Sequence, residues 1–406
     1  MSLSRIERII KSNEFKQIIA EHTNKNYVIN NLIKYMNDSD KIDKDVILSI
    51  NRLRRFPYLL TGSETKIMQS FFEDLICADQ VIDVSLWEKS KNNLYNLSDN
   101  ALQIVEAVLM STGHFQEALG VFKLFINILL HQAEKKTRMK VNYLWAQVYA
   151  PLFNISRSTV EISNPYLFPY NRMPFEVLKS IFITKDYSVK DITMDDTFSK
   201  FICGKKVLVI GPAPIKCYED LVSYDTVIVI NYRGNELYSE RLKNAKNVVT
   251  YYNYEAEDII NNETKDMLNN VDYACFREIR YDYQYQILKQ KKGRVYHCLD
   301  GMQLFGQPYI LQNILFDLLC YAPKSIKLCC FTLYATSQSY GKGYVNKNNA
   351  IYKRYRAFAK HNIINQFMYL VTLFNLGLIS TDPFLEKLIT DGPEKYLYKI
   401  NSLYVS

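Results

Sequence analysis

Two tyrosines follow the last long apolar run of the sequence, in CCFTLYATSQSYGKGY, residues 329–344. The run IKLCCFTLY is typical of a buried strand of a parallel sheet, and Tyr334 and Tyr340 come at its end and in the loop after it. Ligands of such sheets lie at the carboxyl ends of the strands, and a phenol hydroxyl both donates and accepts hydrogen bonds. The pair therefore indicates a polar site, although the chain has 32 Tyr and abundance alone is an alternative explanation.

Two asparagines occupy equivalent places after earlier apolar runs. Asn231 comes at the end of DTVIVIN and Asn253 at the end of NVVTYYN. The amide side chain offers a donor and an acceptor, which suits the edge of a base or the hydroxyls of a sugar. An asparagine that only initiates a turn is the simpler alternative. The paired placement favours a role in binding.

The first expected strand, KKVLVIG, ends in the turn Gly211-Pro212-Ala213-Pro214. This turn has neither the GxGxxG spacing of dinucleotide-binding proteins nor the Lys-Ser/Thr pair of a P-loop. A nucleotide-dependent oxidoreductase is therefore disfavoured. Backbone amides of the turn that face a nucleotide phosphate stay an open alternative.

Histidine is the side chain best suited to acid–base chemistry near neutral pH. His22, His114 and His131 fall in the N-terminal helical region, and His297 is expected inside a buried strand as a core residue. His361, in YRAFAKHNIINQF, opens a helix soon after the tyrosine loop. Taken alone it would be structural, and its interest lies in its neighbours along the chain.

No metal site is expected. The eight cysteines contain no CxxC pair and most stand inside apolar runs, which predicts buried thiols in a reducing compartment and not disulfides or zinc ligands. The acidic DSD at 38–40 belongs to the helical region, and no DxD motif follows an expected strand.

The apolar pattern predicts the elements that position these residues. Short β-branched or aromatic runs begin near residues 205, 225, 247, 271, 294 and 325 and alternate with helix-compatible stretches such as 309–322. This order predicts a mostly parallel, doubly wound, Rossmann-like α/β sheet over 205–406. Residues 1–150 read as helical hairpins, and GHFQEALGVFKLF resembles the second helix of a tetratricopeptide hairpin. The proline-rich stretch 151–204 is expected to connect the two domains.

Composition and charge limit the partners and the cellular location that we expect for the protein. The 406 residues carry a formal net charge of +8, but the basic residues are scattered and no nucleic-acid-binding signature accompanies them. The N-terminus has no apolar core of signal-peptide length, and no window reaches 18 uncharged apolar residues. A cytoplasmic protein that does not bind nucleic acid is expected.

From Lys205 to about Leu376 the sequence resembles the bacterial sialyltransferases of glycosyltransferase family 42. That family has a first strand that ends in a GxGPS turn, asparagines after the next two strands, and a late strand that ends in GIDFY. A second tyrosine follows six residues on, and a histidine follows a lid segment. The matching positions here are GPAP at 211–214, Asn231, Asn253, Tyr334, Tyr340, and His361 followed by Asn365.

The chain departs from the family at several positions. Pro212 and Ile215 replace an Asn and a Ser, FGQ at 305–307 stands where Ser-Gly would open the central helix, and Thr332 is in register with the Asp of GIDFY. The donor-binding residues that the resemblance implies are Gly211, Pro212, Ala213, Asn231, Asn253, Gly306, Gln307 and Thr332.

The resemblance implies transfer of sialic acid from CMP-sialic acid to an acceptor hydroxyl, with neither a metal nor a cofactor. His361 would be the general base, and Tyr334 and Tyr340 would donate hydrogen bonds to the departing CMP phosphate. The span 341–360 would be a mobile lid. Another ulosonic acid, such as Kdo from CMP-Kdo, is an alternative donor sugar.

The resemblance also implies partners. The acceptor would be a surface glycan, capsule or lipooligosaccharide, assembled at the inner face of the membrane with peripheral association of the enzyme. The helical region could bind a protein partner or a second copy of the chain. An alternative from another class is a scaffold protein whose α/β domain has lost activity, with Pro212 and Ile215 as the marks of that loss.

Overall fold

The computed structural model shows a chain that divides into two compact units. The smaller comprises Met1–Ala133 and Asn349–Asn362, and the larger Glu134–Asn348 and Ile363–Tyr404. The residues described are 60–77, 84–131, 141–157, 175–184, 195–232, 234, 242–253, 265–279, 282–290, 292–300, 302–341 and 357–404.

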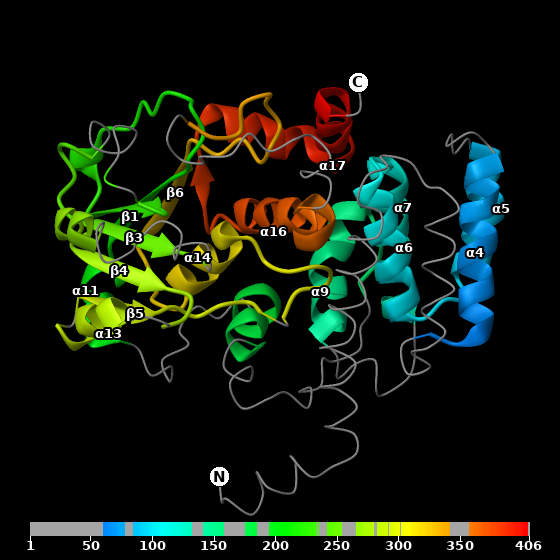
Figure 1. The fold of residues 1–406 in the computed structure, drawn as a ribbon, viewed down its shortest axis with the longest axis horizontal. Helices are drawn as coiled ribbons and strands as arrows, with labels where there is room; N and C mark the ends of the chain where they lie inside the picture. The colour runs from blue at the N-terminus through cyan, green and yellow to red at the C-terminus, as the bar shows by residue number, and fades with distance from the viewer. Residues whose placement is uncertain are drawn as a thin grey trace, which may run out of the picture. The chain divides into compact units, whose positions relative to one another are not determined.

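The larger unit contains an all-parallel sheet with the strand order β5-β4-β3-β2-β1-β6-β7 (Figure 1). The described strands are β1 (Lys206–Ile210), β2 (Thr226–Ile230), β3 (Val248–Tyr252), β4 (Tyr273–Phe276), β5 (Gly293–Val295), β6 (Ser325–Cys329) and β7 (Ser380–Thr381). In the centre of the sheet, Val207 pairs with Thr226 on one side and with Ile326 on the other. The predicted Rossmann-like α/β class is confirmed.

Burial explains why the strands were recognisable. Every residue of β2, β3 and β4 is buried, as expected for a parallel sheet that is covered on both faces. The expectation for His297 is wrong, because β5 ends at Val295 and His297 lies in the loop that follows. Burial lowers the pKa of His297, and its Nε2 is buried without a hydrogen-bond partner among the described residues.

The larger unit also contains helices, several of which flank the sheet (Figure 1). They are α9 (Val141–Tyr149), α11 (Asp196–Ile202), α13 (Asp282–Lys289), α14 (Ile310–Leu319), α16 (Ile363–Asn375) and α17 (Pro383–Tyr404). Helix α9 packs against α16. Short helical turns are η2 (Ala150–Phe153), η3 (Ser180–Thr184), η4 (Leu221–Ser223) and η6 (Lys265–Asn270). Helix α14 confirms the helix expected over 309–322, and it packs against β3 and α16. Helix α17 is kinked at Gly392, whose φ is 86°.

A buried ion pair joins β5 to α14. The guanidinium of Arg294 donates to both carboxylate oxygens of Asp317, and the two side chains are 7% and 0% exposed. Asp317 also accepts hydrogen bonds from the Tyr251 hydroxyl at 2.6 Å and from the backbone amide of His297 at 2.9 Å. A buried carboxylate needs such partners, so this pair fixes the position of α14 against the strands.

The described part of the smaller unit is helical. Its helices are α4 (Gly62–Cys77), α5 (Val84–Leu94), α6 (Asp99–Ser111) and α7 (Phe115–His131), and residues 357–361 are helical as well. Gly113, with a φ of 82°, ends α6 and allows the short turn into α7, so the helical hairpin predicted there is confirmed. Thr61 and Glu64 form a capping box at the start of α4. None of the described helices has the length and apolar character needed to cross a bilayer.

Candidate functional site

The sheet has a topological switch point between β1 and β6. The chain runs outward from β1 to β5 and then returns to add β6 on the other side of β1. Open α/β sheets bind their ligands outside the carboxyl ends of the strands at such a point. The turn Gly211–Pro212–Ala213 leaves β1 there, and the loop with Tyr334 and Tyr340 leaves β6 there.

The two predicted tyrosines lie together. The hydroxyls of Tyr334 and Tyr340 are 3.0 Å apart, and their rings meet edge to face with centroids 6.2 Å apart. A third phenol, Tyr309, precedes α14 and shares a side-chain hydrogen bond with Tyr334. Burial, together with the neighbouring tyrosines, raises the pKa of Tyr334 well above its ordinary value. The phenol therefore stays protonated near neutral pH and can act as a donor.

The tyrosine loop is held from two directions. The amide of Gly341 donates to the Pro212 carbonyl at 2.7 Å, which ties the loop to the turn after β1. From α17, Tyr404 donates to the Tyr334 carbonyl and Tyr396 to the Leu333 carbonyl, each at 2.9 Å. Sequence reasoning missed Tyr309, which precedes α14, and Tyr396 and Tyr404 of α17, because abundant tyrosines carry no signal that points to a distant loop.

The backbone leaving β6 is strained. Cys330, Leu333 and Tyr334 have φ values of 62°, 47° and 66°, a region that residues other than glycine seldom adopt. Each such residue costs about 1–3 kcal/mol and persists only where its surroundings enforce it. The bonds from Tyr396 and Tyr404 provide that enforcement. Clusters of such residues are typical of functional sites.

The backbone amides of the turn after β1 are already hydrogen-bonded to carbonyls at the end of β6 and just after it. The amide of Gly211 donates to the Cys329 carbonyl at 2.8 Å, that of Ala213 donates to the Cys330 carbonyl at 3.2 Å, and Pro212 has no amide hydrogen. Residues 211–220 form no helix, so the helix N-terminus that often binds phosphate is missing here. The turn therefore shapes the site and offers no amide hydrogen to a phosphate in this arrangement.

Asn231 and Asn253 meet at the ends of adjacent strands. Asn231 is buried with a φ of 50°, a conformation that asparagine tolerates, and its side-chain oxygen accepts a hydrogen bond from the amide of Asn253 at 3.3 Å. The structure thus brings together the two asparagines that the sequence placed at paired strand ends.

The remaining predicted donor-binding residues lie in two segments. Thr332 is buried in the exit from β6, while Gly306 and Gln307 precede α14 and are exposed and half-buried. Asn365 of α16 holds the segment before Gly306 in place, because its amide donates to the Gln303 side chain and to the Phe305 carbonyl.

Two oppositely charged side chains lie after the ends of β4 and β5. Arg277 follows β4 and forms an ion pair with Asp300, which lies after β5. The Cys298 thiol also donates to Asp300, at 3.3 Å. Sequence reasoning missed this pair because β4 and β5 are adjacent only in the folded sheet.

His361 belongs to the smaller unit and is half-buried at the end of the helical stretch 357–361. Its neighbour Asn362 donates a 2.7 Å hydrogen bond to Glu106, a buried carboxylate of α6. Burial raises the pKa of Glu106 to about 8, opposed by that hydrogen bond. The tyrosine pair belongs to the larger unit, and most of the expected lid, residues 342–356, lies outside the described residues.

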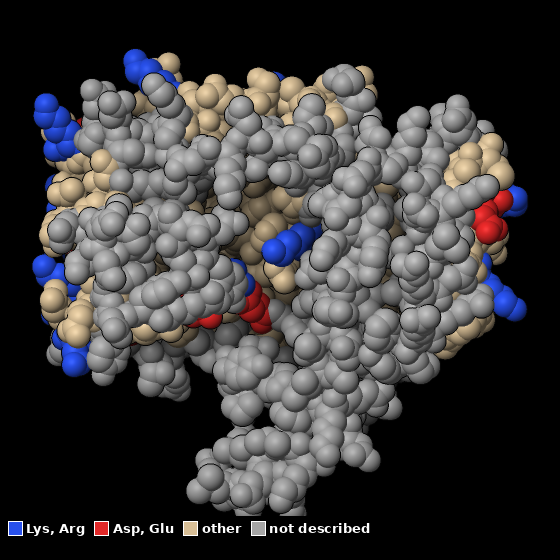
Figure 2. Space-filling model, viewed as in Figure 1, with Lys and Arg blue, Asp and Glu red and all other residues tan. Residues whose placement is uncertain are grey.

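Charge is dispersed. Figure 2 shows the Lys and Arg side chains of the described residues spread over the visible face and not gathered into one patch.

The all-parallel sheet and its polar strand ends define a Rossmann-like α/β protein with a candidate site at the β1–β6 switch point. No family model, no curated protein and no solved structure matches the chain.

Proposed function

We propose that this chain is a glycosyltransferase that moves a sugar acid from a CMP-activated donor to an acceptor hydroxyl, with no metal ion at the leaving group. The observation that carries the proposal is the pair of hydroxyls on Tyr334 and Tyr340, 3.0 Å apart at the switch point of a nucleotide-binding type of sheet. The finer fold proposed is a single nucleotide-binding domain with a lid over residues 341–360.

Loss of CMP from the donor places negative charge on its phosphate. The two phenols would donate hydrogen bonds to that phosphate and stabilise the charge as it develops. The amides of Gly211 and Ala213 already donate to the carbonyls of Cys329 and Cys330, so in this proposal the tyrosines and not the first turn would serve as donors to the phosphate. The strained exit from β6 supports the proposal, since residues in such conformations cluster at functional sites and Tyr334 is one of them.

The asparagines at the next strand ends would bind the nucleotide. The amide groups of Asn231 and Asn253 suit the edge of cytosine or the hydroxyls of ribose. Thr332, Gly306 and Gln307 would complete the donor site beside them.

His361 would act as the general base that takes the proton of the acceptor hydroxyl, since an imidazole has a pKa near the working pH.

The donor sugar would be sialic acid or another ulosonic acid such as Kdo. The acceptor would be a bacterial surface glycan, capsule or lipooligosaccharide, and the enzyme would work in the cytoplasm or at the inner face of the membrane. A net charge of +8 supports peripheral attraction to an anionic leaflet. The helical unit would bind a protein partner or a second copy.

Binding of CMP to the full chain tests the donor site. Calorimetry should detect CMP in preference to UMP and AMP, and Tyr334→Phe should weaken CMP binding about tenfold by removing one hydrogen bond to phosphate. Tyr398→Phe is the matched control, because Tyr398 is 70% exposed on α17.

Absence of CMP binding in a folded protein would reject the donor site. It would favour the alternative function, a scaffold protein with an inactive α/β domain. The observation that supports this alternative is that the backbone amides of Gly211 and Ala213 already donate to Cys329 and Cys330 and are not available to a phosphate.

A further inference from the structure

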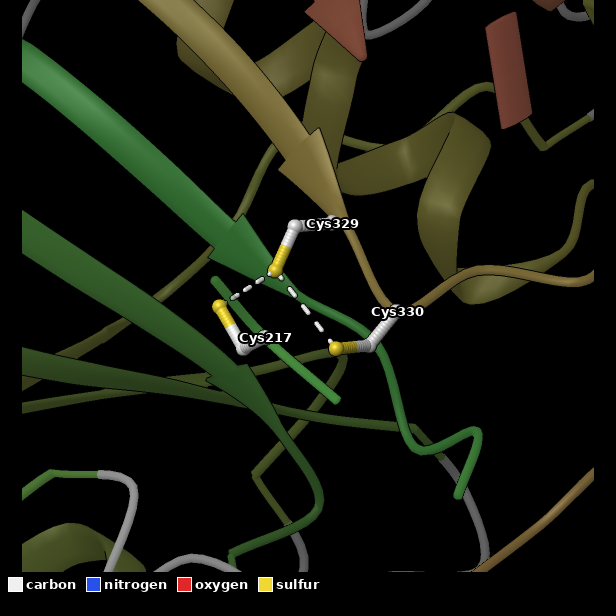
Figure 3. Close-up of side chains that lie close together, drawn as sticks. All are labelled: Cys217, Cys329 and Cys330. Atoms are coloured by element: carbon white, nitrogen blue, oxygen red, sulfur yellow. Dashed lines mark hydrogen bonds between the residues drawn. The ribbon is translucent and has the colours of Figure 1, made fainter. Parts of the chain in front are cut away.

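Three thiols that are far apart in the sequence converge beside the switch point. Cys329 is the last residue of β6, Cys330 follows it directly, and Cys217 lies in the irregular segment after β1 (Figure 3). Their sulfur atoms all lie within 4.8 Å of one another, with 2.8 Å between Cys217 and Cys329 and 3.5 Å between Cys329 and Cys330. None of the three forms a disulfide.

The backbone of Cys330 makes this convergence possible. Consecutive side chains of a regular strand point to opposite faces, so neighbouring cysteines would normally present their thiols on opposite sides. Cys330 instead has a φ of 62°, and its thiol turns toward those of Cys329 and Cys217. The strain of this conformation is thus coupled to the placement of the third sulfur.

We propose that Cys217, Cys329 and Cys330 form a three-thiolate site for a soft metal ion, with Cu(I) as the favoured ion. Soft thiolate ligands select Cu(I) and zinc among the common metals. Among the described residues no histidine, aspartate or glutamate joins the group, and zinc prefers four ligands. A three-coordinate ion therefore fits best. Binding forms three Cu–S bonds and releases the three thiol protons.

The distances require only small movements. Metal–sulfur bonds of about 2.3 Å in a trigonal plane place the sulfurs about 4 Å apart. The Cys217–Cys329 pair would open by about 1 Å to reach that spacing. A disulfide between these two residues is the competing arrangement; it would use two of the three sulfurs and leave the Cys330 thiol donating to the Ile215 carbonyl at 3.3 Å. Cys217 is half-buried and gives the ion a route to the two buried thiols.

Titration of the reduced, metal-free full chain with Cu(I), against a chromophoric Cu(I) chelator under anaerobic conditions, tests the site. The protein should bind one Cu(I) per chain in competition with the chelator. X-ray absorption should show three sulfur neighbours around the ion at about 2.3 Å. Cys217→Ser should lower the affinity at least tenfold. Cys77→Ser and Cys203→Ser remove exposed thiols outside the cluster and should leave it unchanged.

Equal Cu(I) affinity in the wild type and in folded Cys217→Ser and Cys330→Ser would overturn the proposal. A Cys217–Cys329 disulfide that survives mild reductant, found by peptide mapping, would overturn it as well. Both readouts are independent of glycosyl transfer, so failure of this site and failure of the proposed function are distinguishable.

Discussion

At the scale of single residues, the candidate site depends on the hydrogen-bonded phenols of Tyr334 and Tyr340. Tyr334→Phe removes one hydroxyl and leaves the ring and its packing. Loss of one donor to a developing anion lowers turnover about 10²–10³-fold. Steady-state kinetics of CMP release should show a reduced kcat with little change in thermal stability. A Tyr398→Phe variant, altered at an exposed phenol, should keep wild-type kinetics, and equal rates in all three proteins would contradict the role of Tyr334.

Gly211 has a steric role that the structure makes measurable. A Cβ atom at this position would lie 2.3 Å from the Cys330 carbonyl oxygen, so β1 and β6 could not end as close together. Gly211→Ala should destabilise the fold by about 1–3 kcal/mol, as overpacked sites do. Chemical denaturation would measure the loss. Gly62→Ala, where nothing lies within 4 Å of the added atom, should cost far less.

The positions of single site residues could be predicted from the sequence where the order of the strands alone determines them. Asn231 and Asn253 meet because the carboxyl ends of adjacent parallel strands share one edge, and both strands are visible as apolar runs. The thiol cluster was not predictable, because Cys217 and Cys329 are 112 residues apart and the conformation of Cys330 breaks the strand alternation.

At the scale of elements, the Arg294–Asp317 pair should dominate the coupling of β5 to α14. Arg294→Met leaves a buried carboxylate without its main partner and should destabilise the protein by about 3–5 kcal/mol. The double variant Arg294→Met/Asp317→Leu should be more stable than the single one, because no buried charge is left. Urea denaturation of the variants measures both effects.

The exposed pair Lys387–Asp391 provides a control for the buried one. The Lys387 side chain is 76% exposed, so Lys387→Met should cost less than about 1 kcal/mol. If Lys387→Met and Arg294→Met lowered the free energy of unfolding equally, burial would not determine how much the Arg294–Asp317 pair contributes to stability.

Element boundaries show what a sequence pattern can resolve. The long apolar runs predicted β1 to β4, because a strand buried on both faces leaves an unbroken run of apolar residues. Helix α14 and the α6–α7 hairpin were predicted from their length and their helical apolar spacing. The run RVYHCL suggested a longer β5, but the strand ends at Val295 and the chain turns toward Asp300. The two residues of β7 carry no periodicity at all.

At the scale of the whole molecule, Glu106 should make stability depend on pH. Its pKa is raised from 4.5 to about 8 in the folded state, so its protonated form is favoured by folding. Its contribution is complete below the unfolded pKa and is lost as pH rises through about 8. Glu106→Gln keeps an acceptor for Asn362 and removes the charge, with a gain on the order of 5 kcal/mol above pH 8.

Thermal unfolding between pH 5 and pH 9 measures this effect. The difference in Tm between Glu106→Gln and the wild type should grow with pH across that range. Glu88→Gln, at a side chain that is 61% exposed, should show no such trend. Parallel curves for all three proteins would contradict the buried, protonated state of Glu106.

Release of CMP from CMP-sialic acid and from CMP-Kdo by the full chain tests the central claim most directly. The proposed chemistry predicts release from at least one donor without added metal, accelerated by an acceptor glycan, and reduced about 10²-fold or more in Tyr334→Phe and in His361→Ala. No release from either donor by a folded wild-type protein, or release that both variants match, would contradict it.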